Sequence, residues 1–328
     1  MPFLSIIVPV YNKVDFIDSC VNSILKQTFK DFELILINDG STDGSQLKCD
    51  SYTSDSRVKV IHQPNKGVSI ARNVGLSEST GSFIGFIDSD DSIEADMYEI
   101  LINNALNYKA DISVCSIKCI NPLKKQKFLG KNQTVEVYNR DEALTLSLKG
   151  RFWASANNKI YKAEIAQNIK FEGKVNEDLL YTFFAFSQAN RTVFQDIEKY
   201  KYYVRSNSAS LSKFNLRYFE TLKISKIIVE MVSCNMRSHL EEAQSLDFSN
   251  HISMLNLLLL AGTENYFKEY ELIKRNLNEY SIFLKNTNLI SNKQRYAFYI
   301  YKLSPKLYSY FLRLYSSIFA RDLIHRTS

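Results

Sequence analysis

Hydrophobic positions in the first third of the chain follow two alternating patterns. Short runs rich in β-branched residues predict strands, and the stretches between them carry apolar residues at helical spacing. The predicted strands cover residues 4–10, 32–37, 58–61, 82–87 and 111–114, and the predicted helices cover 14–27, 43–52, 67–76 and 95–107. Strands that alternate with helices indicate βαβ units. We therefore expect an α/β fold with a mostly parallel sheet that is covered by helices on both faces.

The pattern changes after about residue 118. The chain then predicts an exposed hairpin or loop, a short helix, two strand-like runs and, between those runs, a helix that begins with acidic residues; these cover 124–137, 140–149, 152–161, 191–205 and 176–187. From residue 215 onward the pattern is helical, with amphipathic stretches at 218–236, 253–260 and 265–284. We expect an α/β domain over residues 1–212, divided into halves at residue 115, and a helical domain over 213–328.

Composition limits the class of protein only loosely. Hydrophobic residues make up 45% of the chain and charged residues 23%, which is ordinary for a globular protein. The net charge of +6 is too small to indicate a nucleic-acid partner. No run of 18 apolar residues predicts a membrane span, and no basic, apolar leader precedes the first strand. Five cysteines, an odd number, predict free thiols rather than a disulfide framework, in keeping with a reducing cytoplasm.

Polar residues follow each of the first four predicted strands. In an open parallel sheet, ligands bind beyond the carboxyl ends of the strands, so these four loops are the candidate site. Their sequences are Pro9-Val10-Tyr11-Asn12, Asn38-Asp39-Gly40-Ser41, Gln63-Pro64-Asn65-Lys66-Gly67 and Asp88-Ser89-Asp90-Asp91. Neither a G-x-G-x-x-G nor a G-x-x-x-x-G-K-[ST] motif is present, which argues against a dinucleotide-dependent dehydrogenase and a P-loop enzyme.

The fourth loop has the most specific chemistry. Three carboxylates crowded at the end of a buried strand repel one another unless a cation neutralises them, and oxygen ligands suit Mg²⁺ or Mn²⁺. Taken alone, Asp88-Ser89-Asp90-Asp91 is equally compatible with an Asx-turn that leads into the next helix. The second loop is similarly ambiguous, because Asn38-Asp39-Gly40-Ser41 can form a turn and a helix cap or can bind a base or ribose.

Taken together, four segments resemble the family 2 glycosyltransferases of GT-A fold, a Rossmann-like architecture. The match is dense over about the first 115 residues and looser up to about residue 212. It is carried by Ser5-Ile6-Ile7-Val8-Pro9-Val10-Tyr11-Asn12, Ile37-Asn38-Asp39-Gly40-Ser41-Thr42-Asp43-Gly44, Asn65-Lys66-Gly67-Val68-Ser69-Ile70-Ala71-Arg72-Asn73 and Phe86-Ile87-Asp88-Ser89-Asp90-Asp91. The resemblance implies an inverting, metal-dependent transferase that uses a nucleotide-sugar donor, typically UDP-linked, in the synthesis of cell-surface polysaccharide or glycoconjugate.

The resemblance also implies roles for individual residues on the donor side. Asp90 would bind the metal ion, Mn²⁺ or Mg²⁺, that bridges the two phosphates. The other donor-side residues would contact the nucleotide, its ribose, the diphosphate or the sugar; they are Pro9, Tyr11, Asn12, Asp39, Lys66, Arg72, Asp88 and Ser89. A later segment with Arg205, Ser208 and Ser210 would close over the diphosphate, and by sequence alone it also fits a polar surface loop.

On the acceptor side, Asp178 corresponds to the family's catalytic base. Glu177 and Asp178 are two acids at a predicted helix start, where the helix dipole is expected to lower their pKa, although such acids are also ordinary N-terminal helix residues. Asp91, Trp153 and Lys159 complete the expected acceptor side, with core packing as the alternative for Trp153 and helix capping for Asp91.

The C-terminal region is basic and aromatic. Residues 293–328 hold seven Lys or Arg, nine Tyr or Phe and one acid, Asp322. Such a helix can lie on an anionic membrane surface, pack on the catalytic domain or form a dimer contact. We expect a glycan, lipid-linked or glycoprotein acceptor, and a cytoplasmic location that includes the inner face of the membrane. The competing interpretations are a nucleotidyltransferase, a catalytically silent nucleotide-sugar- or glycan-binding scaffold, and a C-terminal half that serves chiefly in oligomerisation.

Overall fold

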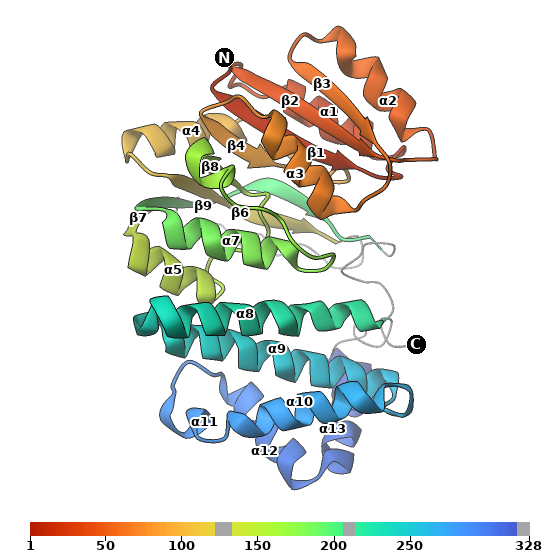
Figure 1. The fold of residues 1–328 in the computed structure, drawn as a ribbon, viewed down its shortest axis with the longest axis vertical. Helices are drawn as coiled ribbons and strands as arrows, with labels where there is room; N and C mark the ends of the chain where they lie inside the picture. Colours follow the sequence, from red (N-terminus) through yellow and green to blue (C-terminus); the bar gives the residue numbers. More distant parts are fainter. Residues whose placement is uncertain (122–132, 206–213, 320–328) are drawn as a thin grey trace. The chain divides into compact units, whose positions relative to one another are not determined.

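The computed structural model describes residues 1–121, 133–205 and 214–319 (Figure 1). It divides the chain into two compact units, Met1–Val204 and Arg205–Ser328. The boundary that we expected after residue 212 falls in a range outside the described residues. Among the described residues no helix is both long enough and apolar enough to cross a membrane.

The first unit is built around one mixed sheet of nine strands within the described residues, in the order β3-β2-β1-β4-β8-β6-β9-β5, with β7 paired to β9. Strands β1 to β4 run parallel, β8 is antiparallel to both β4 and β6, and β6 runs parallel to β9. The strands are β1 (Leu4–Val10), β2 (Phe32–Asp39), β3 (Val58–Gln63), β4 (Phe83–Phe86), β5 (Ser92–Ile93), β6 (Ile112–Ile120), β7 (Val135–Asn139), β8 (Lys159–Lys162) and β9 (Arg191–Tyr203). The predicted α/β fold with a mostly parallel sheet flanked by helices is confirmed.

Helices cover both faces of this sheet. They are α1 (Ile17–Leu25), α2 (Ser45–Ser51), α3 (Val68–Glu78), α4 (Met97–Asn107), α5 (Arg140–Leu148), α6 (Ala163–Ala166) and α7 (Glu177–Gln188). Every residue of β1 is buried, as a central parallel strand requires. Alternate residues of β1, such as Ile6 and Val8, share one core with α1 and α4. Ile7 faces the other way and meets Gly75 of α3, where an added Cβ would lie 2.4 Å from Ile7 Cγ2. The glycine therefore lets α3 pack tightly on the sheet.

Two parts of the secondary structure differ from the prediction. The run 152–161 yields a strand only from Lys159, because the preceding segment satisfies its backbone through a side chain: Lys159 Nζ donates to the carbonyl oxygens of Trp153 and Ser155. In the second unit, the stretch predicted as 253–260 belongs to a helix of 22 residues that begins at Leu240. The part of this helix before residue 253 contains the polar residues Asp247 and His251, which interrupt the apolar pattern although both are buried.

Within the described residues, all regular secondary structure of the second unit is helical. Its helices are α8 (Glu220–Asn235), α9 (Leu240–Ala261), α10 (Phe267–Glu279), α11 (Phe283–Asn286), α12 (Asn292–Leu303) and α13 (Pro305–Phe319). Within this unit α9 lies between α8 on one side and α10 to α13 on the other (Figure 1). Its core is a cluster of apolar residues from α9 and its neighbours, including Phe248, Leu255, Ile273 and Phe298.

Candidate active site

The carboxyl ends of β1 to β4 meet at one edge of the sheet, as the sequence predicted. The strand register places Val10 beside Asn38, and Asp39 beside Gln63. The amide of Ile87, just after β4, donates to the carbonyl of Ile7 at 3.1 Å. Four loops that are far apart in the sequence are therefore brought together.

The first two loops are joined directly. Asn12 adopts a left-handed backbone conformation with φ of 50°. Its amide donates to Ser41 Oγ at 3.1 Å, and its own side-chain oxygen accepts from the amide of Thr42 at 2.9 Å. Tyr11 beside it is 46% exposed, whereas Pro9 is buried in β1. Tyr11 thus offers an accessible aromatic ring at this edge of the sheet.

Asp39 joins the second loop to the third. Its carboxylate accepts hydrogen bonds from Gln63 Nε2 at 2.7 Å and from the backbone amides of Lys66 and Gly67 at 2.9 and 2.8 Å. Gly40 follows with φ of +72°, and an added Cβ there would lie 2.6 Å from the backbone nitrogen of Asn65. Asp39 and Gly40 together fix the start of α3 and leave Lys66 exposed.

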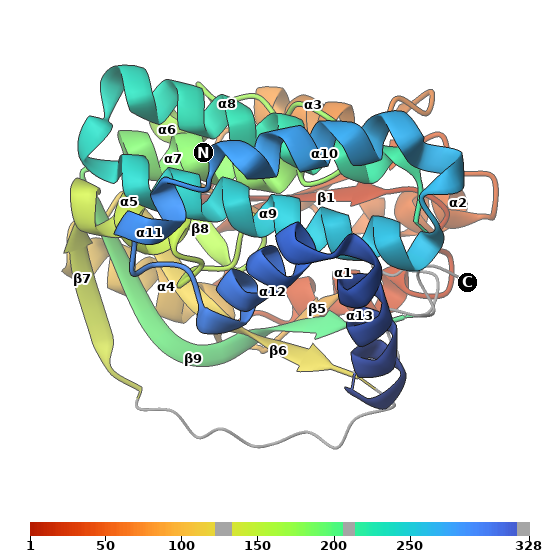
Figure 2. The same ribbon diagram turned by 90° about the horizontal axis from the view of Figure 1, so that it is seen from below.

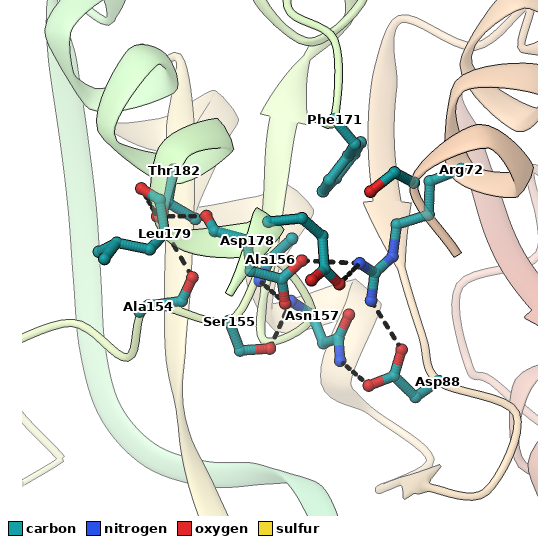
Figure 3. Close-up of polar contacts among 12 residues, drawn as sticks. Arg72, Asp88, Ala154, Ser155, Ala156, Asn157, Phe171, Asp178, Leu179 and Thr182 are labelled. Atoms are coloured by element: carbon teal, nitrogen blue, oxygen red, sulfur yellow. Dashed lines mark hydrogen bonds and ion pairs between the residues drawn. The ribbon is translucent and has the colours of Figure 1, made fainter. Parts of the chain in front are cut away.

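Arg72 is the centre of the site (Figure 3). Its guanidinium is nearly inaccessible, with 3% of the side chain exposed. Nη1 donates to Glu177 Oε1 and Asp178 Oδ1, each at 2.8 Å, and Nη2 donates to Asp88 Oδ1 at 2.9 Å. One face of the guanidinium lies over the ring of Phe171, 5.1 Å from its centroid. We expected Arg72 to contact the donor; instead it is buried and binds three carboxylates.

The buried guanidinium joins two regions that the sequence places 90 residues apart: the aspartate-rich loop after β4 and the start of α7. The loop before α7 is also tied to α3, because Ser69 Oγ donates to the carbonyl of Gly173 at 2.6 Å and Asn73 exchanges two hydrogen bonds with the backbone of Phe171, both at 2.9 Å. Asn176 then enters α7 with a left-handed backbone, φ 56°, so that Glu177 and Asp178 occupy the first helical turn.

One guanidinium cannot neutralise three carboxylates, and the pKa of Asp178 is raised accordingly. Burial raises the pKa of Asp178 to about 7; the charge of Arg72 opposes the rise, while the charges of Glu177 and Asp88 add to it. The helix dipole was expected to lower this pKa, and that expectation is wrong because desolvation and the neighbouring carboxylates outweigh the dipole. The Asp178 side chain remains 18% exposed, so it can still exchange a proton with a molecule in the site.

The segment before β8 holds the two acids in place. The backbone amide of Ala156 donates to Asp178 Oδ2 at 3.3 Å, and Asn157 Nδ2 donates to Asp88 Oδ2 at 2.8 Å. Sequence reasoning missed Asn157, although it lies in the polar run Ser155-Ala156-Asn157-Asn158 directly before a strand. This segment therefore contacts both the aspartate-rich loop and the start of α7.

The side chain of Lys159 holds the segment before β8 in place. It is fully buried, and its ammonium donates to the carbonyl oxygens of Trp153 and Ser155 at 2.8 and 2.7 Å and to Asn158 Oδ1 at 2.6 Å. Burial lowers its pKa to about 7, but three acceptors at these distances use all three N–H donors of a charged ammonium. Lys159 was expected on the acceptor side; it is instead enclosed and cannot touch a substrate. Trp153 is 49% exposed, which excludes the alternative of core packing.

The three aspartates after β4 have different surroundings. Asp88 is the most accessible, with 34% of its side chain exposed. Asp90 pairs with Lys13, Nζ to Oδ2 at 2.6 Å, and its side chain is 18% exposed. Asp91 is 2% exposed and accepts from the hydroxyl of Tyr200 at 2.7 Å and from the amide of Tyr203 at 3.1 Å. It neither caps α4 nor faces an acceptor, so both expectations for Asp91 are corrected: it fastens the loop to β9. Ser89 beside these aspartates is buried.

The surroundings of Asp90 and Asp88 bear on a metal ion. Within the described residues no group of three or more His, Cys, Asp or Glu side chains has the arrangement of a metal site. Mg²⁺ and Mn²⁺ are often held by one or two carboxylates together with substrate phosphates, so two partly exposed aspartates at a strand end fit such an ion. Lys13 lies one residue beyond the first predicted loop. It supplies the positive charge next to Asp90.

Arg205 is the first residue of the second unit, and the expected contacts of Ser208 and Ser210 lie outside the described residues. The closing role of this segment stays a prediction.

Comparison with known proteins agrees with the fold. The chain is 33% identical over 217 residues to the glycosyltransferase GlyA of Streptococcus pneumoniae, a match that covers 63% of this chain and 31% of GlyA. It is 34% identical over 221 residues to the uncharacterized glycosyltransferase EpsJ of Bacillus subtilis, with 65% of this chain and 64% of EpsJ covered. These matches span less than two thirds of either relative.

The solved structure of S. aureus TarS 1-349 has the same fold, with a TM-score of 0.74 at 21% identity over 96% of this chain and 91% of that one. This confirms the expected GT-A architecture. The sequence profile of glycosyl transferase family 2 matches residues 5–172, which contain all four strand-end loops. The chain belongs to glycosyl transferase family 2.

Proposed function

We propose that this protein transfers a sugar from a nucleotide diphosphate donor to an acceptor hydroxyl, with inversion at the anomeric carbon. The observation that carries the proposal is the buried guanidinium of Arg72, which binds Asp88 of the donor loop and Asp178 at once. It holds a proton acceptor at a fixed position relative to the loops where the donor is expected. Family membership supports the reaction class, and the TarS structures in complex with UDP and UDP-GlcNAc support a UDP-linked hexose or N-acetylhexosamine as donor.

In the proposed reaction, the acceptor hydroxyl attacks the anomeric carbon from the face opposite the diphosphate. Asp178 takes the hydroxyl proton through the part of its carboxyl that remains exposed. A pKa of about 7 suits this role, because such a carboxylate is basic enough to accept a proton and is largely ionised just above neutral pH. The positive charge of Arg72 stabilises the ionised form of Asp178 next to Glu177 and Asp88. The amide of Ala156 orients the second carboxylate oxygen of Asp178.

The donor would lie against the first three loops, with the exposed ring of Tyr11 and the ammonium of Lys66 nearest to the nucleotide. Asp90, with Asp88 close by, would hold Mn²⁺ or Mg²⁺. The ion would stabilise negative charge on the departing diphosphate. In our proposal Arg205, Ser208 and Ser210 add donors to that diphosphate, and the acceptor is a glycan, lipid-linked or glycoprotein hydroxyl in cell-surface polysaccharide synthesis.

The decisive experiment replaces the base and keeps its shape. Asp178→Asn should bind the donor as tightly as the wild type but lower the rate of UDP release by about 10²–10⁴-fold, the usual contribution of a general base. Asp141→Asn on α5, an exposed acid in the first turn of its helix, is the matched control and should keep the wild-type rate. If Asp178→Asn releases UDP at the wild-type rate, the base is another group.

Three further measurements test this proposal, and the first separates it from a catalytically silent scaffold. An active enzyme should release UDP from at least one nucleotide-sugar in a panel tested with Mn²⁺, whereas a scaffold should show only a thermal shift. Because the base acts when ionised, kcat should rise with pH and level off above about 7. Proton NMR of the product should show a β-linked sugar from an α-linked donor, and retention of configuration would rule out single displacement.

A further inference from the structure

The last two helices carry a face of exposed apolar side chains that the proposed chemistry does not use. On α13 the exposed residues recur at intervals of three and four, as one stripe of a helix does. Exposed fractions are 43% for Leu307, 64% for Tyr310, 48% for Phe311, 47% for Leu314 and 40% for Tyr315. On α12 the same spacing gives Tyr296, Tyr299 and Leu303, exposed by 63%, 41% and 82%. We call these eight residues the outer face.

The outer face is separate from the packing of the helices within their unit. Tyr308, Leu312 and Ser316 form a second stripe on α13 that is buried, and the Tyr308 hydroxyl donates to Asn256 Oδ1 of α9 at 2.6 Å. In α12 the buried residues are Phe298 and Tyr301. Both helices thus already satisfy their contacts with the core, and the outer face is an additional apolar surface. The two helices lie in the layer of the unit farthest from α8 (Figure 2).

Positive charge accompanies this apolar surface. Residues 292–319 contain five Lys or Arg and no Asp or Glu. Lys306 and Arg313 are exposed on α13 itself. Lys293, at the start of α12, donates to the Tyr315 hydroxyl at 3.0 Å and lies 4.4 Å from that ring's centroid, so an ammonium sits at the edge of the outer face.

We propose that the outer face of α12 and α13 docks on the surface of an anionic lipid bilayer. Aromatic residues with one polar end, of which the face has four tyrosines, favour the boundary between headgroups and acyl chains. Basic side chains next to them meet the negative charge of the headgroups. A second copy of this chain is the less favourable occupant, because a two-fold contact would bring Lys293, Lys306 and Arg313 of one copy close to those of the other with no acid on either helix to compensate.

The test is flotation of the full chain with vesicles of phosphatidylcholine alone and with vesicles that also contain phosphatidylglycerol. The wild type should float with the anionic vesicles, less with the neutral ones, and less in high salt. The double variant Lys306→Gln/Arg313→Gln should bind anionic vesicles about 25-fold more weakly, at about fivefold per cation. Its control, Lys223→Gln/Lys226→Gln, removes two exposed lysines from α8 and should stay within about twofold of the wild type, since α8 is not part of the docking face.

The apolar part of the face is tested separately. Tyr310→Ser/Leu314→Ser should weaken vesicle binding by about tenfold or more, whereas Phe267→Ser/Leu272→Ser, at exposed positions of α10, should not. All four variants alter exposed residues and should keep the circular dichroism spectrum and the rate of UDP release.

Absence of flotation with anionic vesicles, or wild-type binding by Tyr310→Ser/Leu314→Ser, would overturn the proposal. So would light scattering that shows two chains per particle for the wild type and one for that variant, because the occupant would then be a second copy. Since UDP release is measured on the same variants, failure of membrane docking is distinguishable from failure of the proposed function.

Discussion

Each unit of this protein buries a cluster of ionisable side chains, and the two clusters are balanced differently. In the first unit one cation, Arg72, meets three carboxylates, Asp88, Glu177 and Asp178, and all three remain partly exposed. In the second unit one carboxylate, Asp247, is 5% exposed and is surrounded by hydrogen-bond donors. The first cluster holds two more carboxylates than cations, whereas the second holds a single carboxylate whose oxygens accept hydrogen bonds from neighbouring hydroxyls.

The second cluster holds helices together. Asp247 on α9 accepts from the hydroxyls of Ser225 on α8 and Tyr280 after α10, and its backbone carbonyl lies 2.9 Å from His251 Nδ1. Asn276 of α10 reaches the other ring nitrogen of His251 at 3.1 Å. Three helices thus share one satisfied network, as expected for a polar group that specifies packing. The comparison suggests that unbalanced buried charge, rather than buried charge as such, indicates chemistry.

The largest effect should come from removing the one cation of the unbalanced cluster. Arg72→Gln leaves Asp88, Glu177 and Asp178 without their guanidinium, so UDP release should fall by about 10³-fold or more and the free energy of unfolding by about 3–5 kcal/mol. Arg57→Gln is the matched control, because Arg57 pairs with Asp55 at 2.8 Å near the surface and its loss should cost under about 1 kcal/mol. Equal effects of the two substitutions in urea unfolding and in UDP release would show that the buried network of Arg72 contributes no more than a surface ion pair.

The first 115 residues could be predicted well because each strand and helix there has its own periodicity. Every predicted strand among them is present, and the four strand-end loops meet because parallel strands end at one edge. Helix α9 was predicted at less than half its length, because Asp247 and His251 look like surface residues until their partners on α8 and α10 are known.

Within the site, the sequence predicted which residues lie near one another. It did not predict which of them contact protein atoms and which are accessible to a substrate. Arg72, Lys159 and Asp91 were assigned to substrates, yet each is buried against protein atoms. The partners of Arg72 and Asp91 lie up to 106 and 112 residues away in the chain. The ammonium of Lys159 instead binds acceptors one to six residues away, through a turn that the apolar pattern did not indicate. The raised pKa of Asp178 was missed because its largest cause is burial, which depends on the packing of the folded chain, and because Asp88, whose charge adds to the rise, lies in the loop after β4.

A smaller effect should follow from replacing Lys159, a buried lysine whose ammonium donates hydrogen bonds to three uncharged oxygens. Lys159→Met should release the segment that presents Ala156 to Asp178 and Asn157 to Asp88, which should lower kcat by about 10–100-fold and leave donor KM within a few fold. Lys162→Met, an exposed lysine at the end of the same strand, is the control and should behave as the wild type. A larger change in donor KM than in kcat would show that Lys159 supports the donor loops instead of the base.

The smallest effect is a pH dependence of stability that should have opposite signs in the two clusters. The pKa of Asp178 is raised from 3.8 to about 7, so between these values the folded chain binds more protons than the unfolded one, and Asp178 makes stability fall as pH rises. Burial tends to raise the pKa of Asp247, but hydrogen bonds from His251, Ser225 and Tyr280 outweigh it and the net pKa lies below 3.8. The stability that Asp247 contributes is therefore present above 3.8 and is lost as pH falls through its lower folded pKa.

Urea unfolding across this range can separate the two signs. Relative to the wild type, Asp178→Asn should gain stability as pH rises from about 4 to about 7. Asp247→Asn should be less stable by about 2 kcal/mol above pH 4, and the deficit should shrink as the pH falls further. Parallel pH profiles for the two variants would mean that the clusters carry the same charge balance. The excess negative charge around Arg72 would then no longer distinguish the catalytic unit from the helical one.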